Sequence, residues 1–85
     1  MKLLLVEDDE TLRGQLLRNL GSAGYDVDVS ADGEDGLFCA REYAYDLVIV
    51  DIGLPKLSGI DLVKQLREER DTCPVLILTA RSGWQ

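Results

Sequence analysis

Short apolar runs, separated by polar turn residues, divide the chain into regular segments. Residues 2–6, 47–51 and 75–79 are almost continuously apolar, which is typical of strands buried on both faces of a parallel sheet. Residues 25–30 alternate apolar and polar side chains with a period of two, as a strand with one wetter face does. The pattern therefore predicts four strands, of which the second suits an edge of the sheet.

Three segments between these strands carry apolar residues at helical spacing. The predicted helices run from about residue 10 to 23, from about 34 to 43, and from an N-cap at Ser58 to about 69. Their expected inward-facing residues are Leu12, Leu16, Leu17, Leu20 and Ala23 in the first, Leu37, Ala40 and Ala44 in the second, and Leu62, Val63 and Leu66 in the third. Because each helix joins two successive strands, the strands must pair in parallel through right-handed crossovers.

This alternation predicts an α/β fold with an open parallel sheet. The chain has 85 residues, of which 46% are apolar, so it is near the size at which a single core becomes marginal. We therefore expect one small domain.

Acidic residues follow two of the apolar runs where the strands end. Glu7, Asp8 and Asp9 come after the first run, and Asp51 closes the third. Carboxyl ends of parallel strands share one edge, and open α/β sheets keep their sites there. Crowded carboxylates repel one another unless a cation or protons intervene, so the sequence predicts a divalent-metal site. Asp9 also stands at a helix start, where an acidic residue favours the helix dipole.

The overall charge and the cysteines exclude several classes of function. Nine basic and sixteen acidic residues give a formal charge of -7, which disfavours nucleic acid and anionic membranes as partners of this segment. No apolar run approaches the roughly 20 residues of a membrane span, and no signal peptide precedes the first strand, so we expect a cytoplasmic protein. Cys39 and Cys73 lack C-x-x-C spacing, and the chain has no His, which excludes zinc and Cys-His catalysis.

Three motifs carry a family resemblance. They are Val6-Glu7-Asp8-Asp9 after the first strand, Asp51-x-x-Leu54-Pro55 with Gly59 eight residues past the Asp, and Leu78-Thr79-Ala80-Arg81 at the end of the fourth strand. With this order and placement the chain resembles a response-regulator receiver domain of the OmpR/PhoB subclass, whose full-length members are transcription factors. The resemblance implies a flavodoxin-like (CheY-like) sheet in the order 2-1-3-4, with the family's fifth strand missing.

The resemblance also implies roles for the residues at the acidic edge. Asp51 is expected to be the phosphoacceptor, and a carboxylate at a strand end can act as the nucleophile that holds an acyl phosphate. Mg²⁺ would be bound by Asp8, Asp51 and the backbone carbonyl of Gly53, and Glu7 would reach the ion through water. At the end of the fourth strand two further residues would contact the phosphoryl group.

These two residues are Thr79 and Ala80. The Thr79 hydroxyl would donate a hydrogen bond to a phosphoryl oxygen and act as the switch, and Ala80 would contribute its backbone N–H. By residue type alone, Thr79 is also an ordinary β-branched strand residue.

Partners and domain limits follow from the same resemblance. A sensor histidine kinase would supply the phosphoryl group, and the parent protein would contact DNA through a separate output domain. Residues 1–85 are expected to be the N-terminal part of a receiver domain, without the fifth strand, most of the fourth helix, the fifth helix and the DNA-binding domain. The chain would not be an enzyme with a separate substrate. The apolar edge at residues 75–79 predicts self-association.

Two other functions stay open on the sequence alone. A pseudo-receiver would bind a partner without phosphorylation, although such a module usually lacks an acidic ligand and this chain keeps Glu7, Asp8 and Asp51. A haloacid-dehalogenase-like phosphatase also uses an Asp nucleophile and Mg²⁺, but it requires a second Asp where this chain has Gly53. A nucleotide-binding domain would need a Gly-rich turn in place of the acidic one.

Overall fold

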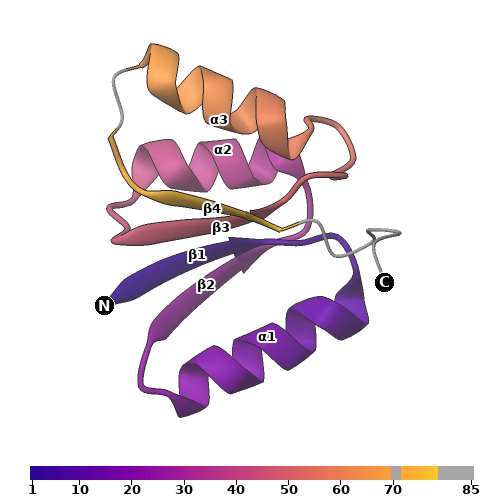
Figure 1. Ribbon diagram of the computed structural model, residues 1–85, viewed down its shortest axis with the longest axis vertical. Coiled ribbons are helices and arrows are strands. Elements are labelled where there is room, and N and C mark those ends of the chain that lie inside the picture. The colour runs from indigo at the N-terminus through magenta and orange to yellow at the C-terminus, as the bar shows by residue number, and fades with distance from the viewer. Residues whose placement is uncertain (70–71, 79–85) are drawn as a thin grey trace.

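The computed structural model describes residues 1–69 and 72–78. Within them strands and helices alternate along the chain (Figure 1). The elements are β1 (Lys2–Val6), α1 (Glu10–Ser22), β2 (Asp26–Ser30), α2 (Gly33–Glu42), β3 (Leu47–Asp51), α3 (Gly59–Glu68) and β4 (Val75–Leu78). The predicted order of elements is confirmed, and the boundaries agree to within one or two residues.

The four strands form one parallel sheet in the order β2-β1-β3-β4. This is the predicted order, and it confirms the predicted edge position of β2. Val29 of β2 is 40% exposed. The register places Val6 beside Ser30 on one side and beside Val50 on the other. The carboxyl ends of β1, β2 and β3 therefore lie level with one another at one edge of the sheet.

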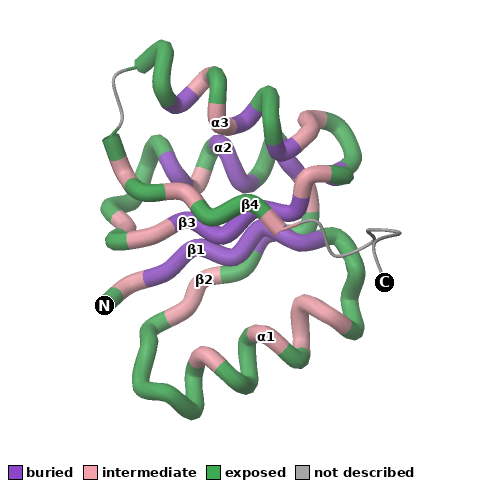
Figure 2. Tube along the Cα trace, viewed as in Figure 1, coloured by how far each residue is buried: buried purple, intermediate pink, exposed green. Residues whose placement is uncertain are grey.

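The face of the sheet covered by α2 and α3 holds the larger core (Figure 1). Alternate residues of β1 and β3 point to this face because the side chains of a strand alternate. The buried cluster consists of Leu4, Val6, Leu37, Ala40, Val48, Val50, Leu54, Leu62 and Leu66. Figure 2 shows the buried residues concentrated in β1 and β3. These two strands are therefore the rigid support for whatever follows their carboxyl ends.

The opposite face is covered by α1 and holds a thinner core. Among the described residues, only Leu3, Leu5 and Ile49 are buried there, with Leu16 and Leu20 of α1 packed against them. No residue of α1 is itself buried. The predicted inward face of this helix was too wide: Leu17 is 37% exposed and Ala23 is also exposed. Leu16 and Leu20, four residues apart, share one narrow stripe, whereas Leu17 lies about 100° around the helix from Leu16.

Polar side chains cap the starts of α2 and α3. Ser58 caps α3 as predicted, because its side chain accepts a hydrogen bond from the Asp61 N–H at 3.2 Å. Asp32 caps α2 in the same way at the Asp35 N–H, at 2.8 Å.

The predicted inward position of Ala44 is wrong. Ala44 is exposed and lies beyond α2, since the backbone is already extended at Tyr43. None of the helices in the described residues is long and apolar enough to cross a membrane.

Candidate metal centre

Three carboxylates meet at the carboxyl edge of the sheet. Glu7 and Asp8 directly follow β1, and Asp51 is the last residue of the neighbouring strand β3. One oxygen from each of them lies within 4.8 Å of the others. Glu7 and Asp51 are each only 1% exposed, whereas Asp8 is exposed. The predicted clustering of these acids is confirmed, and one side of the cluster faces solvent.

Glu7 is held in this cluster by a backbone hydrogen bond. Its Oε2 accepts a hydrogen bond from the Asp9 N–H at 3.0 Å, while the buried Oε1 accepts none from the described residues. Burial raises the pKa of Glu7, and the negative charges of Asp51 and Asp8 raise it further, whereas the bond from Asp9 opposes the rise. The ionised form of Glu7 is therefore disfavoured as long as no positive charge is close to it.

The arrangement suits a hard divalent cation. Carboxylate oxygens are the ligands that Mg²⁺ and Ca²⁺ prefer, and a divalent ion would offset the repulsion among the three acids. Neither Glu7 nor Asp8 forms an ion pair with any residue that the structure describes. The buried, unbonded Oε1 of Glu7 is a further oxygen available to an ion or to its water. The residues therefore fit such a metal.

The turn after β1 is held by two further contacts, neither of which involves a carboxylate oxygen of Glu7, Asp8 or Asp51. The Asp9 side chain accepts a hydrogen bond from the Leu12 N–H at 3.1 Å, so Asp9 caps α1. The Arg13 guanidinium donates to the backbone carbonyl of Glu7 at 2.9 Å. The expectation that Asp9 serves the helix start is thus confirmed. The sequence analysis did not predict the contact of Arg13. Its position four residues after the N-cap Asp9 could have indicated it.

The loop between β3 and α3 forms the other wall of the site. Gly53, exposed, lies two residues past Asp51, and Leu54 anchors the loop in the core. The Gly59 N–H donates to the Ile52 carbonyl at 3.2 Å, and a Cβ at Gly59 would stand 2.5 Å from the Asp51 carbonyl oxygen. Gly59 is therefore required for the close return of the chain.

Three of the site residues expected from the sequence, Thr79, Ala80 and Gly53, have roles that the structure does not test. Thr79 and Ala80 lie outside the described residues, so their roles stay predictions. Gly53 lies in the loop beside the acidic edge, and its role as a carbonyl ligand is likewise a prediction.

A cavity of about 430 Å³ lies at the opposite, amino edge of the sheet. Tyr43, Tyr45, Asp46 and Cys73 are among the residues that line it. It does not coincide with the only group of three metal-ligating side chains found among the described residues. Chemistry and cavity are thus at different ends of this fold.

Comparisons with known proteins agree on one family. A family model described as the response regulator receiver domain matches residues 3–84. The two-component response regulator PhoP of Pseudomonas aeruginosa is 48% identical over 85 residues, which are 100% of this chain and 38% of that protein. This chain therefore spans well under half the length of that curated relative.

Solved structures show the same fold. The response regulator TrrA of Thermotoga maritima in complex with Mg²⁺-BeF has a TM-score of 0.89 at 32% identity, covering 99% of this chain and 73% of that one. TrrA in complex with the histidine kinase ThkA has a TM-score of 0.87 at 32% identity, covering 99% and 72%.

Proposed function

Because the chain belongs to the family of response regulator receiver domains, we propose that it accepts a phosphoryl group on Asp51 from a sensor histidine kinase. The observation that carries the proposal is the position of Asp51: buried at the end of β3, with Glu7 and Asp8 beside it. The chain would act as the acceptor itself rather than as an enzyme with a separate substrate. The parent protein would then regulate transcription from the cytosol through a DNA-binding output domain.

The acceptor step is a displacement at phosphorus. A carboxylate oxygen of Asp51 forms the new P–O bond as the bond from phosphorus to the donor's imidazole nitrogen breaks, and the electron pair of that bond leaves with the nitrogen. Mg²⁺, when bound, neutralises charge on the transferring group. Asp8, Asp51 and the Gly53 carbonyl would hold the ion, with Glu7 acting through water. The placement of Asp51 on a strand with a buried core on both faces keeps its carboxylate oriented for attack.

Two structures of one relative support the identity of the ligand and of the partner. TrrA has been solved with Mg²⁺-BeF and, separately, with a histidine kinase. The carboxylate cluster of this chain is of the type that Mg²⁺ binds. We therefore expect the same kinds of ligand and partner here.

Phosphorylation by a small acyl phosphate donor tests this proposal. In the parent protein, with Mg²⁺ present, intact-mass spectrometry should detect one phosphoryl group per chain that hydroxylamine removes, as an acyl phosphate requires. Asp51→Asn should remain unlabelled, while Asp46→Asn, a matched change at the other edge of the sheet, should be labelled as the wild type is. Equal labelling of Asp51→Asn would overturn the assignment. Mg²⁺ binding without any labelling of the wild type would favour the pseudo-receiver function instead.

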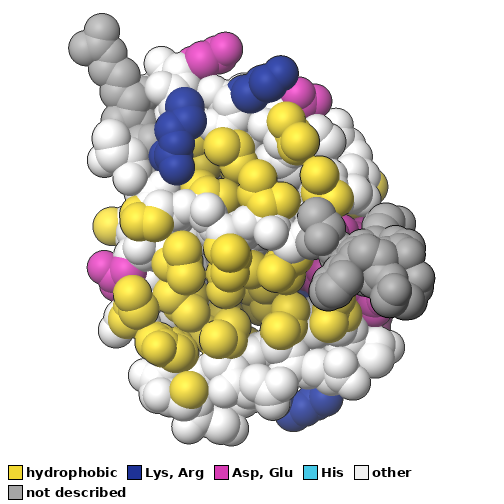
Figure 3. Space-filling view, viewed as in Figure 1, with side chains coloured by type: hydrophobic (Ala, Val, Ile, Leu, Met, Phe, Trp, Pro, Cys, Tyr) yellow, Lys and Arg dark blue, Asp and Glu magenta, His cyan; other side chains and the backbone are white. Residues whose placement is uncertain are grey.

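Self-association of the chain through β4 is the second part of the proposal. β4 is the outermost strand of the described sheet, and Leu76 and Ile77 are 51% and 40% exposed. Figure 3 shows apolar side chains gathered around this strand and between it and α1. Exposed apolar strand edges recruit other chains. Sedimentation at micromolar concentration should show species larger than a monomer, which Leu76→Lys should reduce. A wild type that is entirely monomeric would contradict this.

A further inference from the structure

The start of α2 lies directly against the loop between β3 and α3. The Gly33 N–H donates a hydrogen bond to the Pro55 carbonyl at 3.2 Å. Beside it, the Lys56 ammonium stands 3.7 Å from the Asp32 carboxylate, which also caps α2. Two successive residues of the helix start therefore contact two successive residues of the loop.

The loop segment that they contact is strained. The Leu57 N–H donates to the Pro55 carbonyl at 2.7 Å, a bond that spans two residues and closes a γ-turn around Lys56. Lys56 has a φ of 68° and is the one non-glycine residue with positive φ in the described chain. A γ-turn with positive φ at its centre is rare and strained, and such turns persist only where their surroundings hold them. Here the same Pro55 carbonyl accepts from both Leu57 and Gly33.

Gly33 is required for this contact. A Cβ at this position would stand 1.7 Å from the Leu57 carbonyl oxygen and 2.6 Å from the carbonyl carbon. These are backbone atoms, so no side-chain rotation could relieve the overlap. Any other residue at position 33 would push the loop away from the helix.

Hydrogen bonds connect this contact to both acidic segments. The Glu7 N–H donates to the Ser30 carbonyl at 3.0 Å, and the Ser30 hydroxyl donates to the Asp32 carbonyl at 3.1 Å. On the other side, the loop runs from Asp51 through Gly53 to the turn at Lys56. The turn between β2 and α2 thus bridges the end of β1 and the loop after β3.

We propose that Gly33 is a positioning residue for the metal site: the start of α2 braces the strained turn at Lys56 and so sets where the loop presents the Gly53 carbonyl beside Asp51. This inference rests on the proposed function, in which that carbonyl is a metal ligand. Gly33 itself touches neither the ion nor the phosphoryl group. Its effect on the site passes through Pro55 and Leu57.

Calorimetric titration with Mg²⁺ alone tests the brace. Gly33→Ala should weaken Mg²⁺ binding about tenfold, which is typical of residues that orient ligands, while the far-ultraviolet circular dichroism stays that of the wild type. The matched control is Gly21→Ala in α1, where a Cβ meets nothing within 4 Å, and its affinity should not change. Wild-type affinity in a folded Gly33→Ala chain would overturn the proposal.

A double variant separates positioning from mere stability. Lys56→Gly removes the strain of positive φ, because glycine adopts it freely. In Gly33→Ala/Lys56→Gly the turn can move off the new Cβ, so the urea midpoint should recover while the Mg²⁺ affinity stays low. Recovery of the midpoint and the affinity together would show that Gly33 serves stability alone.

A measurement on the wild type covers the case in which Gly33→Ala does not fold. Coupling between two sites is reciprocal, so Mg²⁺ should slow hydrogen exchange of the Gly33 amide. The Ala23 amide, which donates to Asn19 at the far end of α1, is the control and should not respond. An unaffected Gly33 amide at saturating Mg²⁺ would contradict the brace.

Asp8→Asn distinguishes failure of the brace from failure of the proposed function. Wild-type Mg²⁺ binding in Asp8→Asn would refute the metal site itself. Lost binding in Asp8→Asn together with unchanged binding in Gly33→Ala would refute only the role of Gly33.

Discussion

The acidic side chains near the two edges of the sheet differ in their contacts. Toward the amino edge two acids have partners: the Lys2 N–H donates to Asp46 at 2.7 Å, and the Tyr45 hydroxyl donates to Asp28 at 2.7 Å. The Lys2 ammonium lies 3.7 Å from Asp28 and 5.9 Å from the centre of the Tyr45 ring. These contacts join β1, β2 and the segment entering β3.

At the carboxyl edge three acids are placed beside one another instead. Glu7 and Asp8 form no ion pair with the described residues, and the Arg13 guanidinium donates to a backbone carbonyl rather than to the carboxylates. Burial and neighbouring charge raise the pKa of Glu7. Paired acids stabilise the fold, whereas crowded acids cost stability and gain binding capacity for a cation. The difference marks the carboxyl edge as the functional one.

The largest expected effect of breaking this contrast is on metal binding. Asp8→Ala should weaken Mg²⁺ binding roughly a hundredfold, because a direct charge contact at short range contributes several kcal/mol. Asp46→Ala removes an acid from the other edge and should leave Mg²⁺ binding unchanged. Calorimetry on both variants makes the comparison. Undiminished binding in Asp8→Ala would remove the basis for treating the two edges differently.

A smaller effect is expected on stability without metal. Glu7→Gln should raise the free energy of unfolding by about 1 kcal/mol in a chelating buffer, because it removes a buried charge. Its amide oxygen can still accept from the Asp9 N–H. Urea denaturation measures the change, and added Mg²⁺ should favour the wild type instead.

Glu7 also determines the direction in which the free energy of unfolding changes with pH. The raised pKa of folded Glu7 means that the folded chain binds more protons than the unfolded chain above pH 4.5, the ordinary value. This contribution to stability is therefore complete below about pH 4.5 and is lost as pH rises through the folded pKa. Glu7→Gln should reduce that loss. An identical pH profile in both chains would contradict the raised pKa.

At the amino edge, Tyr45→Phe should lower the free energy of unfolding by about 1 kcal/mol, since a half-buried hydrogen bond to Asp28 is lost. Burial first, and then Asp28, raises the pKa of Tyr45, so this hydroxyl stays a donor throughout the neutral range. Urea denaturation measures the loss. Mg²⁺ affinity should be unchanged, and a parallel fall in affinity would show that the two edges are coupled.

The sequence predicted strand-end acids more reliably than it predicted contacts between loops. Apolar runs locate β1 and β3 because both faces of these strands are buried, and this alone brings Glu7, Asp8 and Asp51 together. The exposure of Leu17 and Ala44 could not be foreseen, since periodicity does not give the width of a buried stripe or the residue at which a helix ends. The contact between Gly33 and Leu57 joins the start of α2 to a loop residue 24 positions later, and no local pattern encodes it.

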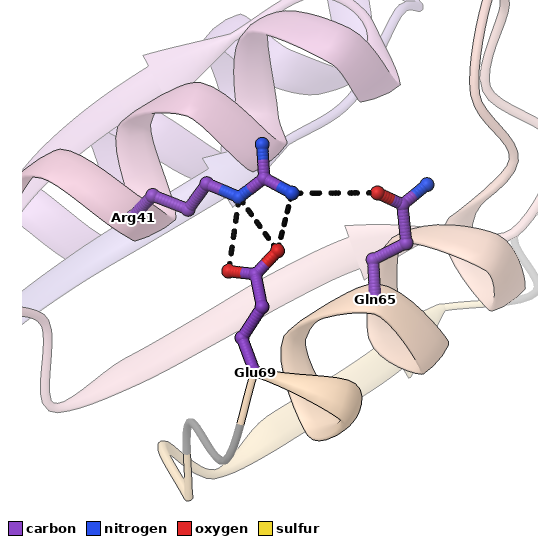
Figure 4. Close-up of polar contacts among 3 residues, drawn as sticks. All are labelled: Arg41, Gln65 and Glu69. Carbon is purple, nitrogen blue, oxygen red and sulfur yellow. Dashed lines mark hydrogen bonds and ion pairs between the residues drawn. The ribbon is translucent and has the colours of Figure 1, made fainter.

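The smallest expected effect concerns a third paired acid near the amino edge. Arg41 near the end of α2 donates through Nε to both carboxylate oxygens of Glu69 at the end of α3, at 2.9 and 2.8 Å, and through Nη2 to Gln65 (Figure 4). The pair lowers the pKa of Glu69 and raises that of Arg41. Both side chains are exposed, so water and salt screen the attraction. Glu69→Gln should shift the urea midpoint less than Tyr45→Phe does, and the shift should shrink in high salt. A larger or salt-independent shift would mean that this pair orients α3 against α2 and is more than a weak surface ion pair.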